Sequence, residues 1–236
     1  MKVMKNIAIV VVTYNRIASV KRLLASLQSA DYPHEVTLII SIDKSDSHIV
    51  EDYAEKFEWK HGTKIVAKHD VNLGLRKHML SIGDYTKSYD GVIVLEDDLV
   101  VSPSFYNFSV ATVERYSDDD RIAGISLYNF STNHQNYLPF VPDKNEFDAY
   151  MFQNAQSWGQ VWVKNKWDSF ISWYHDNCEE FKEESHLPVN ICHWGKNSWL
   201  KYHIKYCIEN DKYFVYPYTS LTFNYGDTGT HSTEIN

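Results

Sequence analysis

Three consecutive carboxylic acids, Glu96, Asp97 and Asp98, follow a short apolar run of the sequence. If that run is a buried strand, the negative charges at its end repel one another, and this costs stability unless a cation or several N–H donors offset them. Carboxylate oxygens suit Mg2+ and Mn2+, which bind diphosphates through one or two carboxylates and several waters. The triplet therefore predicts a site for Mn2+ or Mg2+ that holds a diphosphate. The alternative is a solvated acidic turn that caps the next helix.

Polar turns also follow three other apolar runs. They occupy residues 13–16, 43–46 and 69–72, and two of them contain carboxylic acids. In open parallel sheets, ligands bind outside the carboxyl ends of the strands. The four turns together therefore form the predicted ligand-binding edge.

The elements that must position these turns follow from hydrophobic periodicity. Short β-branched runs alternate with amphipathic segments, a pattern typical of a parallel sheet covered by helices. We predict an α/β fold in which Ser102 is the N-cap of the fourth helix and Pro103 its first residue. The predicted strands are residues 7–12, 36–42, 64–67, 91–95 and 122–127, and the predicted helices are residues 17–29, 46–59, 75–89 and 104–116.

The periodicity weakens after Tyr128, where Asn, Tyr and Pro become frequent up to about residue 145. Such a stretch is either a mobile loop or a surface that receives a second ligand. Further on we predict helices at about 165–180 and 196–209 and a strand at 213–216. No linker rich in Gly, Pro or Ser separates two independent domains.

The composition excludes several classes of protein. The chain has 236 residues and a net charge of −8 with scattered basic residues, which argues against a nucleic-acid binder that relies on phosphate neutralisation. Its longest apolar run is far shorter than the ~20 residues that cross a bilayer, and shorter than a signal-peptide core. Cys178, Cys192 and Cys207 form no C-x-x-C pair, which indicates reduced thiols. We expect a cytoplasmic protein with no transmembrane segment, and leave peripheral membrane association open.

In order along the chain, these motifs resemble the GT-A glycosyltransferases, specifically the bacterial family-2-like enzymes and the N-acetylglucosaminyltransferase I group. The resemblance covers about residues 5–130 well and the rest in fragments. It implies a GT-A (Rossmann-like) fold with a mostly parallel central sheet flanked by helices and an irregular C-terminal acceptor-binding part. Residues 1–130 would bind the nucleotide sugar, and residues 131–236 would bind the acceptor within the same domain. The matching segments are residues 11–16, Asp43, and residues 72–76, 94–99 and 102–105.

The resemblance also implies roles for single residues. Asp98 would hold the metal ion, and Asp97 would contact ribose or donor-sugar hydroxyls. Asp43 would accept a hydrogen bond from uracil, and Arg76 would pair with a phosphate or with an acidic carboxylate. The implied donor-binding set is Thr13, Tyr14, Asn15, Arg16, Asp43, Asn72, Arg76, Glu96, Asp97, Trp158 and Gly159. The purely structural alternatives are helix capping for Thr13 and Asn15 and, for Arg76, a positive charge on the surface of a helix.

The second half supplies two further expectations. Gly159, between Trp158 and Trp162, would let a sugar approach the backbone closely, and tryptophans stack on the apolar faces of pyranose rings. For Trp158, Trp162, Trp167, Trp194 and Trp199 the alternative is plain core packing. In the C-terminal tail, His231 stands where many members of the fold supply a metal or phosphate contact, and the alternative there is a frayed terminus.

The catalytic base is the weakest match. An inverting transfer needs a carboxylate or imidazole within hydrogen-bond reach of the acceptor hydroxyl. The N-acetylglucosaminyltransferase I group uses an Asp directly before a Trp, and Ser198 stands at that position here. His193 and Asp227 are the candidates, followed by Glu146 and Asp148. Otherwise the leaving phosphate itself deprotonates the acceptor, and the anomeric configuration is retained.

The leading hypothesis is a metal-dependent glycosyltransferase that moves a sugar from a nucleotide-diphosphate donor, with UDP as the favoured nucleotide. The expected acceptor is a glycan or lipid-linked glycan in bacterial surface polysaccharide synthesis. The first alternative is a degenerate, non-catalytic binder of glycan or nucleotide, which Ser198 favours. The second is a sugar-phosphate nucleotidyltransferase, which normally carries an early Gly-rich loop, and residues 13–20 contain no glycine.

Overall fold

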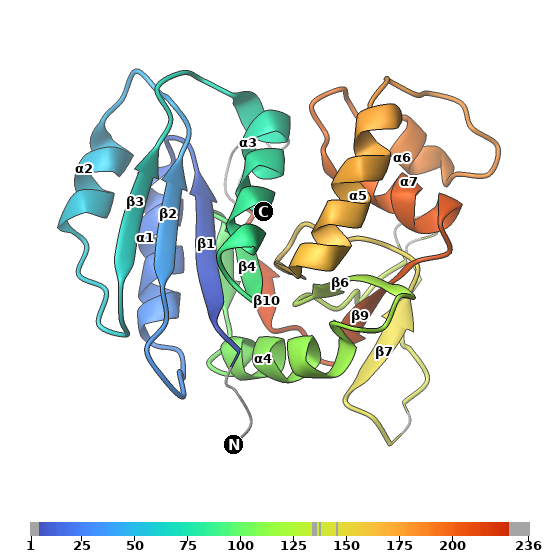
Figure 1. Cartoon of the computed structure of the whole chain (residues 1–236), viewed down its shortest axis with the longest axis horizontal. Helices are drawn as coiled ribbons and strands as arrows, with labels where there is room; N and C mark the ends of the chain where they lie inside the picture. The colour runs from blue at the N-terminus through green and yellow to red at the C-terminus, as the bar shows by residue number, and fades with distance from the viewer. Residues whose placement is uncertain (1–4, 134–135, 137, 145, 227–236) are drawn as a thin grey trace.

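The structure is a computed structural model that describes residues 5–133, 136, 138–144 and 146–226. Its centre is an eight-stranded sheet in the order β3-β2-β1-β4-β8-β6-β9-β7 (Figure 1). The strands β1 to β4 are mutually parallel, whereas β8 runs antiparallel to both β4 and β6, and β7 runs antiparallel to β9. The strands are Ile7–Thr13 (β1), Leu38–Ile42 (β2), Lys64–Lys68 (β3), Gly91–Glu96 (β4), Ile122–Ser126 (β6), Ala149–Phe152 (β7), Gln160–Trp162 (β8) and Tyr213–Pro217 (β9).

A small second sheet lies beside the first. It pairs β5 (Leu99–Val101) with β10 (Thr222–Asn224) in antiparallel register, so that Asn224 stands opposite Leu99. Residues near the C-terminus are thereby joined to the strand that directly follows the acidic triplet.

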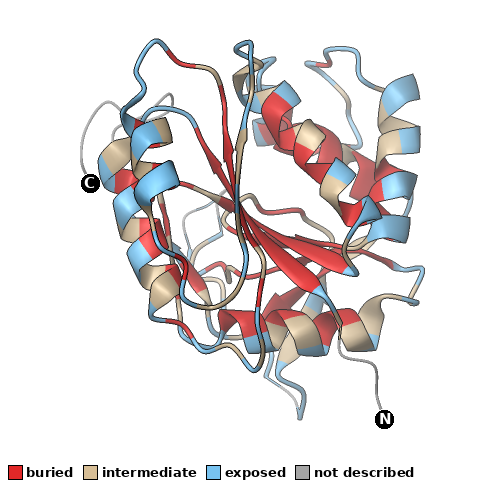
Figure 2. Cartoon of the chain, turned by 60° about the vertical axis from the view of Figure 1, so that its left-hand side comes forward, coloured by how far each residue is buried: buried red, intermediate tan, exposed pale blue. Residues whose placement is uncertain are grey.

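Helices cover both faces of the large sheet, and two apolar clusters result. Side chains of Ile7, Ile9 and Val11 pack with α1 and α4 on one face, while Ala8 and Val10 pack with α3, α5 and α7 on the other. Figure 2 shows buried strands between helices whose outer faces are exposed. Because β1 is covered on both faces, its residues form a continuous apolar run. The helices are Ile17–Gln28 (α1), Ile49–Lys56 (α2), Gly74–Ile82 (α3), Phe105–Tyr116 (α4), Lys164–Asp176 (α5), Val189–Cys192 (α6) and Leu200–Glu209 (α7).

The predicted α/β fold with a mostly parallel sheet is confirmed, and its six predicted strands, including 213–216 as β9, are all present with ends shifted by up to two residues. The sequence pattern missed β5, β7, β8, β10 and α6, which are short. The strand β8 comes from the second half of the chain and lies between β4 and β6, so one sheet runs through both predicted parts. The division into donor and acceptor parts stays a prediction.

Several predicted helix ends are wrong. The N-cap of α4 is Ser104 rather than Ser102, so Pro103 precedes the helix. The predicted helix 46–59 is shortened to α2, since the hydroxyl of Ser45 accepts a hydrogen bond from the Ser47 N–H and holds the chain in a turn. The predicted helices 165–180 and 196–209 are likewise shortened, to α5 and α7.

The predicted helix 75–89 divides at Gly83 into α3 and a 3-10 helix, η1 (Gly83–Lys87). A Cβ atom at Gly83 would lie 1.8 Å from the Trp167 ring, so α5 packs directly on the backbone at this point. Glycine weakens an α-helix, which explains why the helix changes form here.

Candidate functional site

The acidic triplet lies at the carboxyl end of β4, beside the end of β1. Val12 pairs with Glu96 in the parallel register, which brings the turn after β1 next to the turn after β4. The Thr13 hydroxyl donates a hydrogen bond of 2.7 Å to Asp97, and the Arg16 guanidinium contacts Asp97 and, at 3.2 Å, Asp98. Asp97 is buried, so these two partners hold its carboxylate in place.

The charges at this edge are unbalanced, with three carboxylic acids facing the single guanidinium of Arg16. Burial and then the negative charges of Asp98 and Asp97 raise the pKa of Glu96 to about 8, although Arg16 opposes the shift. Burial also raises the pKa of Asp97 against the opposing effects of Arg16 and Thr13. Ionising all three carboxylic acids is therefore unfavourable in the metal-free protein, and a bound cation would relieve that cost.

The donor set fits a divalent ion. Within the described residues, no hydrogen bond is made to the Oδ1 atom of Asp98 or to the Glu96 carboxylate, and the Asp98 side chain is 17% exposed. Hard, unshared carboxylate oxygens at a negatively charged edge are what Mg2+ and Mn2+ bind. The alternative of a helix-capping turn is wrong, because β5 follows the triplet directly and Ser104 is the N-cap of α4.

The turn after β1 exposes two side chains beside the triplet. Tyr14 and Asn15 are exposed, and Tyr14 keeps 43% of its accessible surface. The capping alternative for Thr13 and Asn15 is wrong, since the N-cap of α1 is Arg16 and no side chain caps that helix. Both exposed side chains are therefore free to face a ligand, and their predicted contacts with a nucleotide stay predictions.

Asp43 and Asn72 join two loops at the same edge of the sheet. The buried Asp43 carboxylate accepts hydrogen bonds from the backbone N–H groups of Lys44, Leu73 and Gly74 at 2.8–2.9 Å. The Asn72 amide donates to the Lys44 carbonyl at 2.8 Å. Gly74 has φ of 71°, a conformation that glycine adopts without strain. Asp43 therefore fixes the start of α3, and its contact with uracil stays a prediction.

Arg76 lies elsewhere than expected. Its guanidinium donates to the Tyr174 hydroxyl at 2.8 Å and to the carbonyls of Cys178 and Lys196, and it lies 4.2 Å from the Tyr202 ring centroid. The predicted pairing with an acidic carboxylate is wrong, because Arg16 occupies that place. The surface-cation alternative is wrong too, since Arg76 ties α3 to the layer of α5 and α7.

Gly159 is required by packing of the protein itself. Its φ is 96°, and a Cβ atom there would lie 2.9 Å from Thr222 Cγ2 and 3.2 Å from Leu127 Cβ. Leu127 N–H donates to its carbonyl at 2.9 Å, and the Thr222 hydroxyl donates to the neighbouring carbonyl of Trp158. The expectation that this glycine leaves room for a sugar is therefore wrong, because β10 and Leu127 occupy that room.

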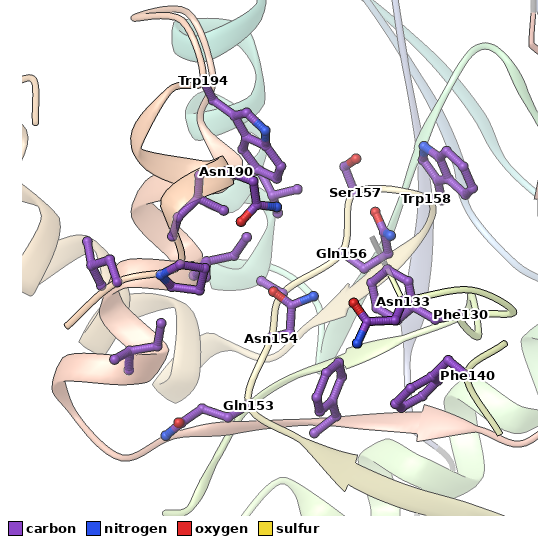
Figure 3. Close-up of a pocket in the computed structure, with 18 of the residues that line it drawn as sticks. Phe130, Asn133, Phe140, Gln153, Asn154, Gln156, Ser157, Trp158, Asn190 and Trp194 are labelled. Atoms are coloured by element: carbon purple, nitrogen blue, oxygen red, sulfur yellow. The ribbon is translucent and has the colours of Figure 1, made fainter. Parts of the chain in front are cut away.

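The tryptophans divide into two groups. Trp162, Trp167 and Trp199 are buried, and the rings of Trp162 and Trp167 stack 4.0 Å apart, so core packing is confirmed for them. Trp158 and Trp194 are half-buried and line a cavity of about 760 Å3 (Figure 3). Of the five tryptophans, Trp158 and Trp194 are therefore the two that line this cavity.

Three of the candidates for the base lie in the described part of the chain, and each of them is exposed. His193 is exposed at the end of α6, next to Trp194. Glu146 and Asp148 are exposed in the loop before β7 and do not line the cavity. Asp227 and His231 lie outside the described residues. The last described segment is attached to the triplet, since the Tyr225 N–H donates to the Asp98 carbonyl at 3.0 Å.

Residues 8–168 match the family Glycosyl transferase family 2. The match covers more than half of the 236 residues, and the chain belongs to this family. No curated protein sequence matches the chain.

Solved structures share the fold at low sequence identity. The S. aureus TarS 1-349 structure in complex with UDP-GlcNAc is 15% identical with a TM-score of 0.57, and covers 96% of this chain and 60% of its own. GalNAc-T7 with UDP, GalNAc and Mn2+ is 14% identical with a TM-score of 0.58, over 94% of this chain and 44% of its own. The mannosyltransferase PcManGT from Pyrobaculum calidifontis with GDP-Man and Mn2+ is 11% identical with a TM-score of 0.53. The match covers 92% of this chain and 55% of the PcManGT chain.

These matches confirm a GT-A glycosyltransferase fold and do not confirm the similarity to the N-acetylglucosaminyltransferase I group. The chain spans at most 60% of each of these three solved chains. Among the described residues, no helix combines the length and apolar character needed to cross a bilayer.

Proposed function

We propose that this chain transfers a sugar from a nucleoside diphosphate sugar, UDP-linked, to a glycan acceptor. The observation that carries the proposal is the acidic turn, where Thr13 and Arg16 hold Asp97 while Asp98 Oδ1 has no hydrogen-bond partner among the described residues. Membership of glycosyltransferase family 2 supports the reaction class. UDP is favoured because TarS and GalNAc-T7 were both solved with uridine nucleotides, whereas PcManGT was solved with GDP-Man.

Asp98, with Glu96 beside it, would hold the Mn2+ or Mg2+ ion. Such an ion stabilises the negative charge that develops on a leaving diphosphate. Arg16 keeps Asp97 and Asp98 oriented, and Tyr14 and Asn15 face the nucleotide. Asp43 positions the loop before α3 and accepts from uracil. Two solved relatives of the fold contain Mn2+, which supports the choice of ion.

The wider role rests on the resemblance to bacterial family-2 enzymes. The proposed acceptor is a glycan or lipid-linked glycan of a bacterial surface polysaccharide, and the proposed site of action is the cytoplasmic face of the membrane. Residues 131–236 would bind this acceptor. His193 and Asp227 remain the proposed bases.

The first test is release of UDP from UDP-GlcNAc, UDP-glucose and UDP-galactose, with Mn2+ and after chelation. Asp98→Asn is expected to lower turnover by about 100-fold or more, since stabilisers of a developing charge contribute several kcal/mol. Asp118→Asn is the matched control, because Asp118 is exposed in the loop after α4. Undiminished release by Asp98→Asn, or by chelated protein, would contradict the proposal.

A non-catalytic binder is the second candidate function, and Ser198 favours it because it replaces the expected Asp. This candidate predicts that UDP binds with Mn2+ while no UDP-sugar is consumed when glycan acceptors are added. The nucleotidyltransferase alternative has no support from the family match.

A further inference from the structure

One wall of the cavity, at Trp158, belongs to the segment that leads into β8, the strand paired with β4. β8 pairs with β4 in antiparallel register, with Gln160 opposite Val94, and Trp158 lies two residues before Gln160 in the chain. The Trp158 carbonyl is held by Thr222 of β10, the strand whose partner β5 directly follows the triplet. One wall of the cavity is therefore attached to the elements that form the proposed donor site.

The cavity has the size of a small-molecule site, about 760 Å3 against the roughly 300–1,000 Å3 typical of ligand pockets. Figure 3 shows Trp194 and Asn190 on one side of it and Ser157, Trp158 and Gln156 on the other. Its floor includes the aromatic rings of Phe130, Phe140 and Phe152. Flat apolar surfaces thus face the same space as hydrogen-bonding groups.

The polar groups of this lining are neutral. Apart from His186, each polar side chain that lines the cavity is an amide or a hydroxyl, within the described part of the chain: Thr132, Asn133, Gln153, Asn154, Gln156, Ser157 and Asn190. An amide both donates and accepts hydrogen bonds, as a sugar hydroxyl does. An alkyl chain in this space would offer no hydrogen bonds to the amides of Asn154, Gln156 and Asn190, and covering polar groups in this way costs free energy.

The charges at the rim also argue against an anionic ligand. His186 contacts Glu209 at 3.1 Å and Glu184 at 3.6 Å, and the Glu184 carboxylate pairs with Lys205 at 2.6 Å. The lysine is thus engaged by a carboxylate, and the second carboxylate adds negative charge at this end. A phosphate or carboxylate ligand would meet repulsion here, and His186 is the only basic side chain on the walls among the described residues.

We propose that this cavity binds the acceptor and that the acceptor end it receives is an uncharged saccharide. The inference rests on the proposed function and adds the chemical class of the acceptor. The tryptophan and phenylalanine rings take the apolar faces of the sugar rings. The amides of Asn190, Asn154 and Gln156 take the hydroxyls.

The test measures binding without donor or metal, by calorimetry and saturation-transfer NMR. The neutral probes are tetrasaccharides of glucose, galactose and N-acetylglucosamine, and the charged probes are tetragalacturonate and glycerol phosphate oligomers. Decyl phosphate tests a lipid. We expect at least one neutral tetrasaccharide to bind more tightly than each charged probe and than decyl phosphate. Binding of UDP with Mn2+ is measured separately on the same protein.

Two variants test whether the saccharide binds in the cavity. Trp194→Ala removes a ring of the wall, and Asn190→Asp replaces a neutral donor by a carboxylate; each is expected to weaken saccharide binding by about tenfold. Asn197→Asp makes the same chemical change at an exposed position that does not line the cavity, and should leave binding unchanged. Unchanged UDP binding by the variants shows that they are folded.

The proposal is overturned if no neutral probe binds, if a charged probe or decyl phosphate binds more tightly than all neutral probes, or if Asn197→Asp weakens binding as much as Asn190→Asp. Saccharide binding at the cavity without any binding of UDP would refute the proposed function while supporting the ligand class of the cavity.

Discussion

Removing the guanidinium of Arg16 should destabilise the metal-free protein strongly. In Arg16→Met the buried Asp97 carboxylate keeps the Thr13 hydroxyl as its one remaining partner among the described residues, and Asp98 loses the contact with Arg16. Breaking a fully buried ion pair by removing one partner costs about 3–5 kcal/mol. Because the Arg16 side chain is 27% exposed, water compensates part of this, and we expect a loss of about 2–3 kcal/mol. That is a large share of the roughly 5–15 kcal/mol typical of folded domains.

The assay is urea unfolding of the wild type and Arg16→Met in chelator and in Mn2+. The control is Arg121→Met, whose guanidinium contacts Asp119 at 2.7 Å with 69% of its side chain exposed. Exposed pairs contribute about 0–1 kcal/mol, so the control should change stability little. Equal losses in the two variants would show that the buried position of Asp97 does not matter and would refute the reasoning.

The effect of Mn2+ on the stability of the variants is a second test. An ion bound at the proposed site, Asp98 and Glu96, would replace part of the positive charge that the variant lacks. Mn2+ should therefore reduce the loss caused by Arg16→Met and leave Arg121→Met unaffected. Saturating Mn2+ that stabilises neither the wild type nor Arg16→Met would contradict a metal site at the triplet, because a ligand that binds the folded state alone must stabilise it.

Two further predictions concern stability. Gly159→Ala should lower the unfolding free energy by about 1–3 kcal/mol, because residue 159 has a positive φ and the new Cβ atom would contact Thr222 and Leu127. Gly195→Ala is the control in thermal unfolding, since a Cβ atom there has no neighbour within 4 Å. Burial and the nearby His69 lower the pKa of His78 to about 4, below its ordinary 6.5, so the unfolded chain binds one more proton between these values. Stability should therefore fall as the pH drops from 6.5 to 4, by about 3 kcal/mol from this group. Gln in His78→Gln can still form a hydrogen bond with Ser41, so the loss of unfolding free energy between pH 6.5 and 4 should be about 3 kcal/mol smaller in this variant. If urea unfolding at several pH values gives the same pH profile for the variant and the wild type, the lowered pKa of His78 is contradicted.

The parallel half of the fold could be predicted from sequence because its signals are local. Each strand of β1 to β4 is an apolar run long enough to be recognised, and each is followed by a polar turn. The short strands β5, β8 and β10 have three residues each, too few to show a period of two. Their positions depend on pairing with strands far away in sequence, which no local pattern reports.

The site was predictable to the same extent. The triplet and the turn after β1 stand where the strand ends predicted them. The cavity was not predictable, because its walls come from α6, α7 and the loop before β8, which lie next to one another only after β8 enters the sheet. The one available signal was the frequency of Asn, Tyr and Pro between Tyr128 and about residue 145, which indicated either a mobile loop or a surface for a second ligand, but not the place of a cavity.

The choice between two arginines shows what decides such a site. Arg76 precedes the triplet by only twenty residues and lies in a recognisable motif, yet its guanidinium is held by Tyr174 and two carbonyls. Arg16 is about eighty residues from Asp97 and contacts it, because β1 and β4 are neighbours in the sheet. The order 3-2-1-4 is the usual order of doubly wound sheets. Once that order is assumed, the turn after β1 must lie against the turn after β4, and Arg16 is the basic residue in it. Strand order, more than spacing along the chain, therefore selects the cation that faces an acidic turn.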